Sequence, residues 1–299
     1  MLTGFRRRET REGPLRTLFL LTSMPVGGAE TLLVNLVRKL DRRRFAPEIA
    51  CIKEPGELGE AMAAEVPVHS GFLRNKYDVR VLWRLARLMR ERQIDAVVTV
   101  GCGDKMFWGR LAARADNVPV ILSALHSTGW PDGVGRLNRL LTPITDGFIG
   151  VAQAHGEHLI HNERFPAEKV HVIPNGVDGD RFAPSEELRA EARRELGIDD
   201  ETPLVGIVAA LRPEKNHELF LRAAAIVQRK LHSTRFVIIG DGPERENCVR
   251  WTRELGLTES VHFLGSRGDV PKWLAAIDLF ALTSHNEANP VSILEAMSC

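Results

Sequence analysis

Residues 279–295 read LFALTSHNEANPVSILE, which predicts a strand, a loop and a helix in close succession. Asn289 is a favourable N-cap residue, and Pro290 suits the first helical position, where its missing N–H costs nothing. The free N–H groups of such a helix start can hold a phosphate. Glu287 in the loop and Glu295 in the helix lie eight positions apart. Both carboxylates are able to accept hydrogen bonds from sugar hydroxyls.

Outward from this stretch, apolar runs of strand length alternate with patterns of helical period. The expected strands are 18–21, 49–52, 66–69, 94–100, 118–125, 147–151, 169–173, 204–210, 236–239, 261–264 and 279–282. The expected helices are 29–40, 79–93, 185–196, 217–231, 244–255 and 270–276. This alternation predicts an α/β protein with mainly parallel sheets covered by helices.

Turn residues interrupt the alternation at 174–180 and predict a domain boundary there. We expect a flexible basic arm over 1–16, a first Rossmann-like domain over 17–178 and a second over 179–299. In doubly wound sheets ligands bind beyond the carboxyl ends of the strands, so two such domains face to face make a cleft.

Composition indicates an ordinary globular protein. The 299 residues are 44% hydrophobic and 26% charged, with a formal net charge of +1, which argues against a nucleic-acid partner. No apolar run has the length of a spanning helix, and no signal peptide is visible. The cysteines are too far apart to form a metal-like pair, which favours a reduced, cytoplasmic protein. They are Cys51, Cys102, Cys248 and Cys299.

Two features of the first half are candidates for ligand binding. Gly27 and Gly28 directly follow the first strand and open a helix, so the backbone can approach an anion closely; a simple tight turn is the alternative. His126 follows the strand 118–125, where its imidazole can contact a ligand or cap a loop.

The second half offers basic candidates and two turns. Lys215 and Arg212 lie in AALRPEKNH, residues 209–217, after the first strand of the second domain. Without neighbouring motifs these would be surface charges in a loop. The turns are IPNGVD at 173–178 and GDGP at 240–243, the second either near a nucleotide base or a plain turn.

Taken in order, these segments resemble the retaining glycosyltransferases of family 4, which have the GT-B fold of two Rossmann-like domains facing a cleft. Glu287 and Glu295 match the family's E-x7-E motif, and residues 27–30 match G-G-[AT]-E. Residues 209–217 resemble R-L-x-P-E-K-[GN], except that Ala210 stands at the position of the family's arginine. Arg212 is the candidate replacement. The resemblance also implies further βα units, so we expect the second domain to be incomplete.

The resemblance implies transfer of a sugar from a nucleotide-diphosphate donor to a hydroxyl acceptor, with retention, by a hexosyltransferase-type enzyme (EC 2.4). The acceptor would be a glycan or a lipid-linked molecule in surface polysaccharide or glycolipid synthesis. No metal is expected, because no D-x-D-type carboxylate cluster is visible and basic groups with helix dipoles can stabilise a diphosphate. The implied catalytic residues are His126, Lys215 and Glu287. The implied residues for the donor diphosphate or nucleotide are Gly27, Gly28, Arg212, Lys215, Asn289, Pro290 and Glu295.

Two alternatives remain open at this point: a nucleotide-sugar 2-epimerase on the same fold, and a non-catalytic nucleotide-sugar-binding fragment. The helix 79–93, which carries five arginines up to Arg92, is also open to two interpretations. It is either a crossover helix with a solvated basic face or a docking face for an anionic membrane, which would place the protein peripherally on the inner face of the membrane.

Overall fold

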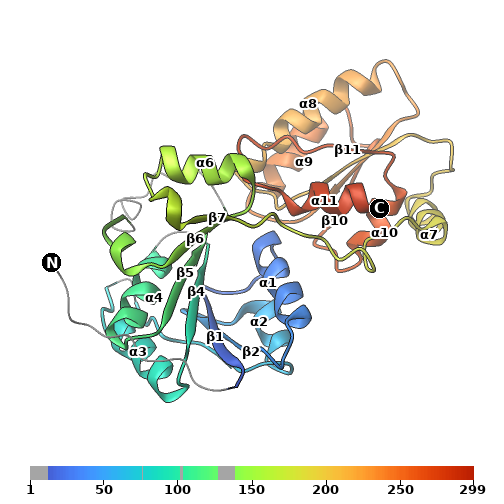
Figure 1. Cartoon of the computed structure of the whole chain (residues 1–299). Coiled ribbons are helices and arrows are strands. Elements are labelled where there is room, and N and C mark those ends of the chain that lie inside the picture. The colour runs from blue at the N-terminus through green and yellow to red at the C-terminus, as the bar shows by residue number, and fades with distance from the viewer. Residues whose placement is uncertain (1–12, 76, 102–103, 127–138) are drawn as a thin grey trace. The chain divides into compact units, whose positions relative to one another are not determined.

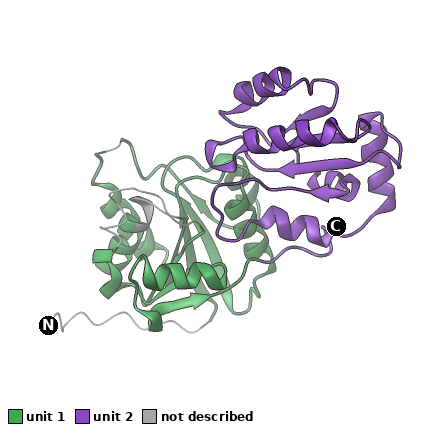
Figure 2. Ribbon diagram, turned by 90° about the horizontal axis from the view of Figure 1, so that it is seen from above, with its two compact units in different colours: residues 1–175 green, residues 176–299 purple. Residues whose placement is uncertain are grey.

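The computed structural model describes residues 13–75, 77–101, 104–126 and 139–299 (Figure 1). The chain divides into two compact units, Met1–Asn175 and Gly176–Cys299 (Figure 2). The division lies three residues before the expected domain boundary. Most of the expected basic arm lies outside the described residues, and its expected end was two residues too late, because the first strand already begins at Leu15.

Unit 1 contains a seven-stranded parallel sheet in the order β3-β2-β1-β4-β5-β6-β7. Its strands are β1 Leu15–Leu21, β2 Phe45–Cys51, β3 Val68–His69, β4 Ala96–Val100, β5 Val120–Ala124, β6 Gly147–Gly150 and β7 Val170–Val172. The order reverses between β1 and β4, as in a doubly wound Rossmann sheet.

Helices cover both faces of this sheet. They are α1 Gly28–Lys39, α2 Gly56–Met62, α3 Val81–Glu91, α4 Asp104–Ala115 and α6 Gln153–His161. Successive residues of β1 point to opposite faces: Leu18 and Leu20 pack with Leu85 of α3, whereas Phe19 packs with Leu33 of α1. The apolar strands therefore contribute to a separate core on each side, as a parallel sheet requires.

Unit 2 contains a four-stranded parallel sheet in the order β10-β9-β8-β11. Its strands are β8 Leu204–Val208, β9 Arg235–Ile239, β10 Val261–Gly265 and β11 Leu279–Phe280. Its helices are α7 Glu186–Leu196, α8 His217–Gln228, α9 Arg245–Glu254, α10 Val270–Ala276 and α11 Val291–Ser298. Here too the order reverses, between β8 and β11, so the expected doubly wound α/β fold is confirmed for both units.

Two corrections concern residues 279–295. The strand β11 comprises only two residues, where four were expected. Pro290 is the N-cap of α11 rather than its first helical residue, so the expected N-cap at Asn289 was wrong by one position. Pro290 has an extended ψ of 121°, and the N–H of Ile293 bonds its carbonyl, so the helix begins one residue later.

Candidate active site

Loops from β8 and β11 meet at the switch point of the unit 2 sheet. Thr283 Oγ donates to the carbonyl of Asn216 at 2.9 Å, and the N–H of His285 donates to the carbonyl of Glu214 at 3.0 Å. These bonds join the loop after β11 to the short 3-10 turn Pro213–Lys215. Crevices at such switch points bind ligands in doubly wound folds. Sequence reasoning missed Thr283, because a threonine in a loop carries no distinctive local signal.

The joined loops bring Lys215 and Glu287 together. Lys215 Nζ lies 2.5 Å from Glu287 Oε1, across 72 residues of sequence. Both side chains are about a quarter exposed, at 25% and 23%, so the pair is accessible from solvent. An ammonium beside a carboxylate here provides one group for an anionic ligand and one acceptor for hydroxyl groups.

The GDGP turn supports the loop that carries Lys215. The N–H of Leu211 bonds the carbonyl of Asp241 at 3.0 Å, and the N–H of Glu244 bonds the carbonyl of Leu211 at 2.9 Å. Gly240 has a φ of +140°, and a Cβ there would lie 2.1 Å from the carbonyl oxygen of Ala209. Glycine is needed because two backbones approach closely. The structure thus assigns this turn an architectural role.

Arg212, the candidate replacement for the arginine expected at Ala210, is exposed. Among the described residues its guanidinium forms no hydrogen bond or ion pair, so it is accessible to a ligand. Asn216, next to Lys215, takes the left-handed conformation with a φ of +49° and caps α8 by accepting from the N–H of Leu219 at 3.3 Å. This explains why an asparagine or glycine suits the position.

His217 is the first residue of α8 and directly follows this loop. Its side chain is only 2% exposed, and neither ring nitrogen has a hydrogen-bond partner among the described residues. Burial, followed by the charge of Lys215, lowers the pKa of His217 to about 4, with Glu244 acting in the opposite direction. The imidazole is therefore neutral near pH 7 and packs as an apolar group.

Glu295 lies in the second turn of α11 and is half-buried. Burial raises the pKa of its carboxyl group, and the positive charge of Arg181 acts in the opposite direction. Within the part of the chain that the structure describes, no side chain donates a hydrogen bond to this carboxylate. It is consequently an acceptor open to a ligand.

In unit 1, Gly27 is the extended N-cap of α1, which begins at Gly28, at the switch point between β1 and β4. A Cβ on Gly27 would lie 2.5 Å from the carboxylate of Glu30. Glu30 therefore folds back over the helix start, in the position of a capping-box glutamate. The sequence analysis included Glu30 in the family motif but did not predict that its carboxylate lies at the expected anion site.

His126 lies two residues beyond β5 and is half-buried. Burial, with a smaller contribution from the nearby His155, lowers its pKa to about 4. The imidazole is thus neutral near pH 7 and able to donate one hydrogen bond and accept another.

The candidate residues fall into two groups, each described within its own unit. Gly27, Gly28 and His126 belong to unit 1; Arg212, Lys215, Glu287, Asn289, Pro290 and Glu295 belong to unit 2. Among the described residues, no group of three or more His, Cys, Asp or Glu side chains is arranged to hold a metal ion.

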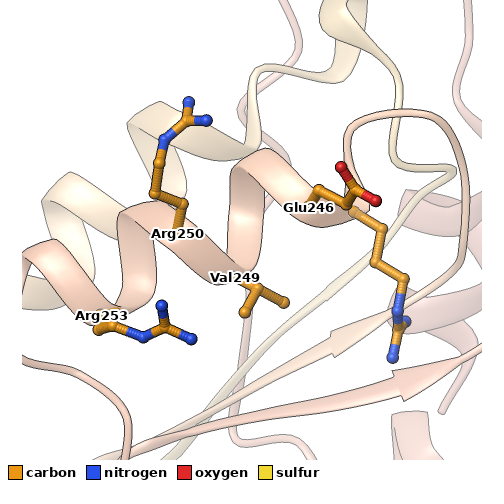
Figure 3. A pocket seen from close by; sticks show the side chains of 5 residues that line it. Glu246, Val249, Arg250 and Arg253 are labelled. Atoms are coloured by element: carbon orange, nitrogen blue, oxygen red, sulfur yellow. The ribbon is translucent and has the colours of Figure 1, made fainter.

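A groove of about 420 Å³ lies on α9 of unit 2 (Figure 3). It is lined by Arg245, Glu246, Val249, Arg250 and Arg253. None of the candidate residues lines this groove. Its side chains all come from one exposed helix, and Arg250 lies 3.7 Å from Glu254, so the groove is a charged helix face rather than part of the candidate site.

The basic helix of unit 1 is largely neutralised by acidic neighbours. The ion pairs are Arg84–Asp78 at 2.6 Å, Arg87–Glu91 at 2.7 Å, Arg90–Asp116 at 2.8 Å and Arg92–Glu48 at 2.9 Å. Arg80 is exposed, and beside it Tyr77, Val79 and Trp83 are 84%, 63% and 68% exposed. No described helix combines the length and apolar character needed to cross a bilayer.

Comparisons with known proteins match both units. The model of "Glycosyltransferase Family 4" matches residues 26–181, and that of "Glycosyl transferases group 1" matches residues 189–299. A putative glycosyltransferase, EpsF, of Bacillus subtilis is 26% identical over 298 residues, covering 95% of this chain and 77% of the relative.

Two further relatives have more specific names. The UDP-Gal:alpha-D-GlcNAc-diphosphoundecaprenol alpha-1,3-galactosyltransferase of Escherichia coli is 28% identical, over 92% of this chain and 75% of its own. The GDP-mannose-dependent alpha-(1-6)-phosphatidylinositol monomannoside mannosyltransferase of Mycolicibacterium smegmatis is 27% identical, over 90% of this chain and 73% of its own.

Among solved structures, Anabaena HepE in complex with UDP and glucose superposes with a TM-score of 0.82 at 22% identity, over 95% of this chain and 78% of HepE. At that identity the likeness shows the fold.

Proposed function

Because the chain belongs to glycosyltransferase family 4, we propose that it transfers a sugar from a nucleotide-diphosphate donor to a hydroxyl acceptor with retention of anomeric configuration. The observation that carries this proposal is the Lys215–Glu287 pair at the switch point of the unit 2 sheet. One member is a cation suited to a diphosphate, and the other is an acceptor suited to sugar hydroxyls. The enzyme class is that of the glycosyltransferases, EC 2.4.

The proposed chemistry begins with cleavage of the bond between the anomeric carbon and the diphosphate oxygen. Negative charge develops on the leaving diphosphate, where Lys215 and the accessible Arg212 stabilise it. The sugar becomes oxocarbenium-like, and Glu287 holds its hydroxyls. The acceptor oxygen bonds to the anomeric carbon on the same face while its proton passes to a diphosphate oxygen. Atoms and charges then balance without a protein nucleophile.

The remaining candidate residues have supporting roles in this proposal. Glu295 accepts hydrogen bonds from the ribose. The amides of Gly27–Gly28 favour the diphosphate, as do the free N–H groups at the start of α11, directly after Asn289–Pro290; Pro290 itself has no N–H to donate. His126 contacts the donor sugar in this proposal, as a neutral imidazole because burial lowers its pKa to about 4. Since these groups and Lys215 supply the electrostatic stabilisation, we propose that turnover needs no metal ion.

The names of the relatives support an acceptor class. The E. coli relative is named for a diphosphoundecaprenol-linked substrate and the M. smegmatis relative for a phosphatidylinositol mannoside. We propose a lipid-linked or glycan acceptor in surface polysaccharide or glycolipid synthesis for this chain. The 2-epimerase alternative is not favoured, because the named relatives are transferases.

The proposal is tested first by thermal unfolding with UDP-, GDP- and ADP-sugars. One nucleotide class is expected to stabilise the protein, and Lys215→Ala should reduce that stabilisation. Donor turnover is then measured with and without candidate acceptors. Turnover that requires an acceptor supports a transferase; donor conversion without any acceptor would indicate an epimerase, and binding without turnover a non-catalytic protein.

We further propose that the surface beside α3 contacts a membrane. Its support is the exposed pair Tyr77 and Trp83, since both residue types favour the bilayer interface, together with the exposed Arg80. The paired arginines of α3 contribute little free charge. Co-sedimentation with vesicles containing phosphatidylglycerol is expected to fall on Trp83→Ala. Equal sedimentation of the variant and the parent protein, or none by either, would rule out this contact.

A further inference from the structure

The turn that opens unit 2 contacts two segments far away in the sequence. The carbonyl of Asp178 accepts from the N–H of Phe182 at 2.8 Å, and Phe182 is buried. Arg181 Nη2 donates to the carbonyl of Gly268 at 3.1 Å, 87 residues away in the loop between β10 and α10. Ser298 Oγ donates to the carbonyl of Phe182 at 2.5 Å, 116 residues away at the end of α11. One turn therefore holds both the β10–α10 loop and α11.

Glu295 lies one helical turn before Ser298, on the element that this turn holds. Its carboxylate is half-buried and accepts no side-chain hydrogen bond within the described residues. Arg181 is the cation whose field acts on it, and the Cys299 thiol is the other titratable group that interacts with it. The pKa of Cys299 is raised by burial and by the charge of Glu295, so this thiol stays neutral near pH 7.

We propose that Arg181 is a positioning residue for the donor nucleotide: the turn that carries it is bonded to the end of α11, and it helps to place Glu295 on that helix where the carboxylate accepts the ribose hydroxyls. The proposal rests on the proposed function, in which Glu295 binds that ribose. It adds a residue from the turn at the start of unit 2 to the nucleotide site. The ligand class is a ribonucleoside diphosphate, because the 2′- and 3′-hydroxyls of its ribose are donors that suit this carboxylate.

The charge of Arg181 has a predictable effect on pH dependence. A carboxylate accepts ribose hydrogen bonds best when it is ionised, so affinity should fall as pH drops through the pKa of Glu295. Burial raises that pKa and Arg181 opposes the rise. Removing the cation therefore moves the loss of affinity to higher pH. A residue with a purely structural role would not produce this shift.

The experiment compares Arg181→Gln, Arg181→Lys, Glu295→Gln and the control Arg229→Gln, an exposed arginine at the end of α8. Calorimetry measures binding of the diphosphate selected in the thermal panel and of its 2′,3′-dideoxy analogue between pH 5 and 8. We expect Arg181→Gln to weaken binding of the ribonucleotide roughly three- to tenfold at neutral pH and to leave binding of the dideoxy analogue nearly unchanged. We also expect it to raise the midpoint pH, the pH at which half of the affinity for the ribonucleotide is lost. Arg181→Lys and the control should keep the parent midpoint.

The outcomes separate the two proposals. If Glu295→Gln binds both nucleotides as the parent protein does, the ribose role of Glu295 fails and the Arg181 role with it. If Glu295→Gln loses the preference for ribose but Arg181→Gln keeps the parent pH profile, only the Arg181 role is overturned. Equal weakening of both nucleotides by Arg181→Gln also overturns it. Should that variant not fold, a midpoint displaced in the charge-preserving Arg181→Lys would overturn the electrostatic role.

Discussion

Lys215 and Glu287 neutralise each other in the unliganded chain, and a bound donor must take the place of each partner. Since both side chains are about a quarter exposed, solvent screens their attraction, and such a pair is worth only about 0–1 kcal/mol. The pair therefore orients the two groups without making them costly to separate. This weak pairing suits a site in which the ammonium has to reach a phosphate and the carboxylate a sugar.

The first prediction concerns Lys215→Ala. We expect kcat/KM for donor turnover to fall about 10²–10³-fold, because one cation opposite the developing charge is lost. The free energy of unfolding should change by less than about 1 kcal/mol. Lys230→Ala, at an exposed lysine after α8, is the matched control. Unchanged turnover in Lys215→Ala would contradict the assignment of the diphosphate site.

The second prediction concerns His217 and acid stability. Its pKa is about 4 in the folded protein against an ordinary 6.5, so between these values the unfolded chain binds the proton and the folded chain does not. Stability present above pH 6.5 is consequently lost as pH falls towards 4, by up to about 3 kcal/mol from this residue. In His217→Leu, the free energy of unfolding measured with urea should therefore depend less on pH between 6.5 and 4 than in the parent protein.

His232→Gln, at an exposed histidine in the turn after α8, serves as the control for His217→Leu and should retain the parent slope. If His217→Leu shows the same loss of stability between pH 6.5 and 4 as the parent protein, burial of a neutral imidazole at this position is not responsible for the slope.

At the scale of elements, the loop after β8 depends on its neighbours rather than on its own propensity. The GDGP turn bonds it from one side, and the loop after β11 bonds it from the other. Residues 209–216 thus take one shape although only three of them, Pro213–Lys215, form a regular turn. The geometry at Lys215 follows from the packing of three loops.

The third prediction follows from that packing. Gly240→Ala places a Cβ 2.1 Å from the Ala209 carbonyl oxygen and should destabilise unit 2 by roughly 2–3 kcal/mol, as overpacking does. Gly197 has a φ of +68°, and a Cβ there would lie in open space. Gly197→Ala should therefore lower the free energy of unfolding by only about 1 kcal/mol, through conformational strain alone. Urea unfolding measures the free energy of unfolding of both variants. If the two variants lose the same amount, the close approach of the Gly240 and Ala209 backbones does not add to the cost of the substitution.

For the whole molecule, each unit has its own sheet and its own cores, so a ligand of the unit 2 site acts first on that unit. Linkage between binding and folding then determines how much the nucleotide raises the free energy of unfolding of unit 2. The increase is about 2.7 kcal/mol when the nucleotide concentration is one hundred times the dissociation constant.

The fourth prediction uses this separation. In hydrogen exchange followed by mass spectrometry, the nucleotide selected in the thermal panel should slow exchange in 209–217 and 281–295. Exchange in α3 should stay unchanged. Lys215→Ala provides the control, since it should show weaker protection at the same nucleotide concentration. Protection confined to the arginine groove on α9 would place the nucleotide elsewhere.

Much of the fold could be predicted from single segments. Continuous apolar runs identified the buried strands, and α10 has the expected bounds, Val270–Ala276. The helices α2, α4 and α6 were not predicted individually; α2 reads GELGEAM, whose two glycines weaken helical propensity and whose apolar residues are few. Neither Thr283 nor Arg181 could be found from the sequence, because each acts through backbone carbonyls or charges far along the chain.

The sequence by itself determined the alternation of strands and helices, the two Rossmann-like units and the family motifs, since propensity, turn chemistry and periodicity act over a few residues. Only the tertiary structure decided that β11 lies beside β8, which brings Lys215 to Glu287 over 72 residues, and that the turn containing Arg181 is bonded to α11, the helix that carries Glu295. Strand order depends on how whole elements pack and on which backbone groups remain to be paired, and no local pattern carries that information.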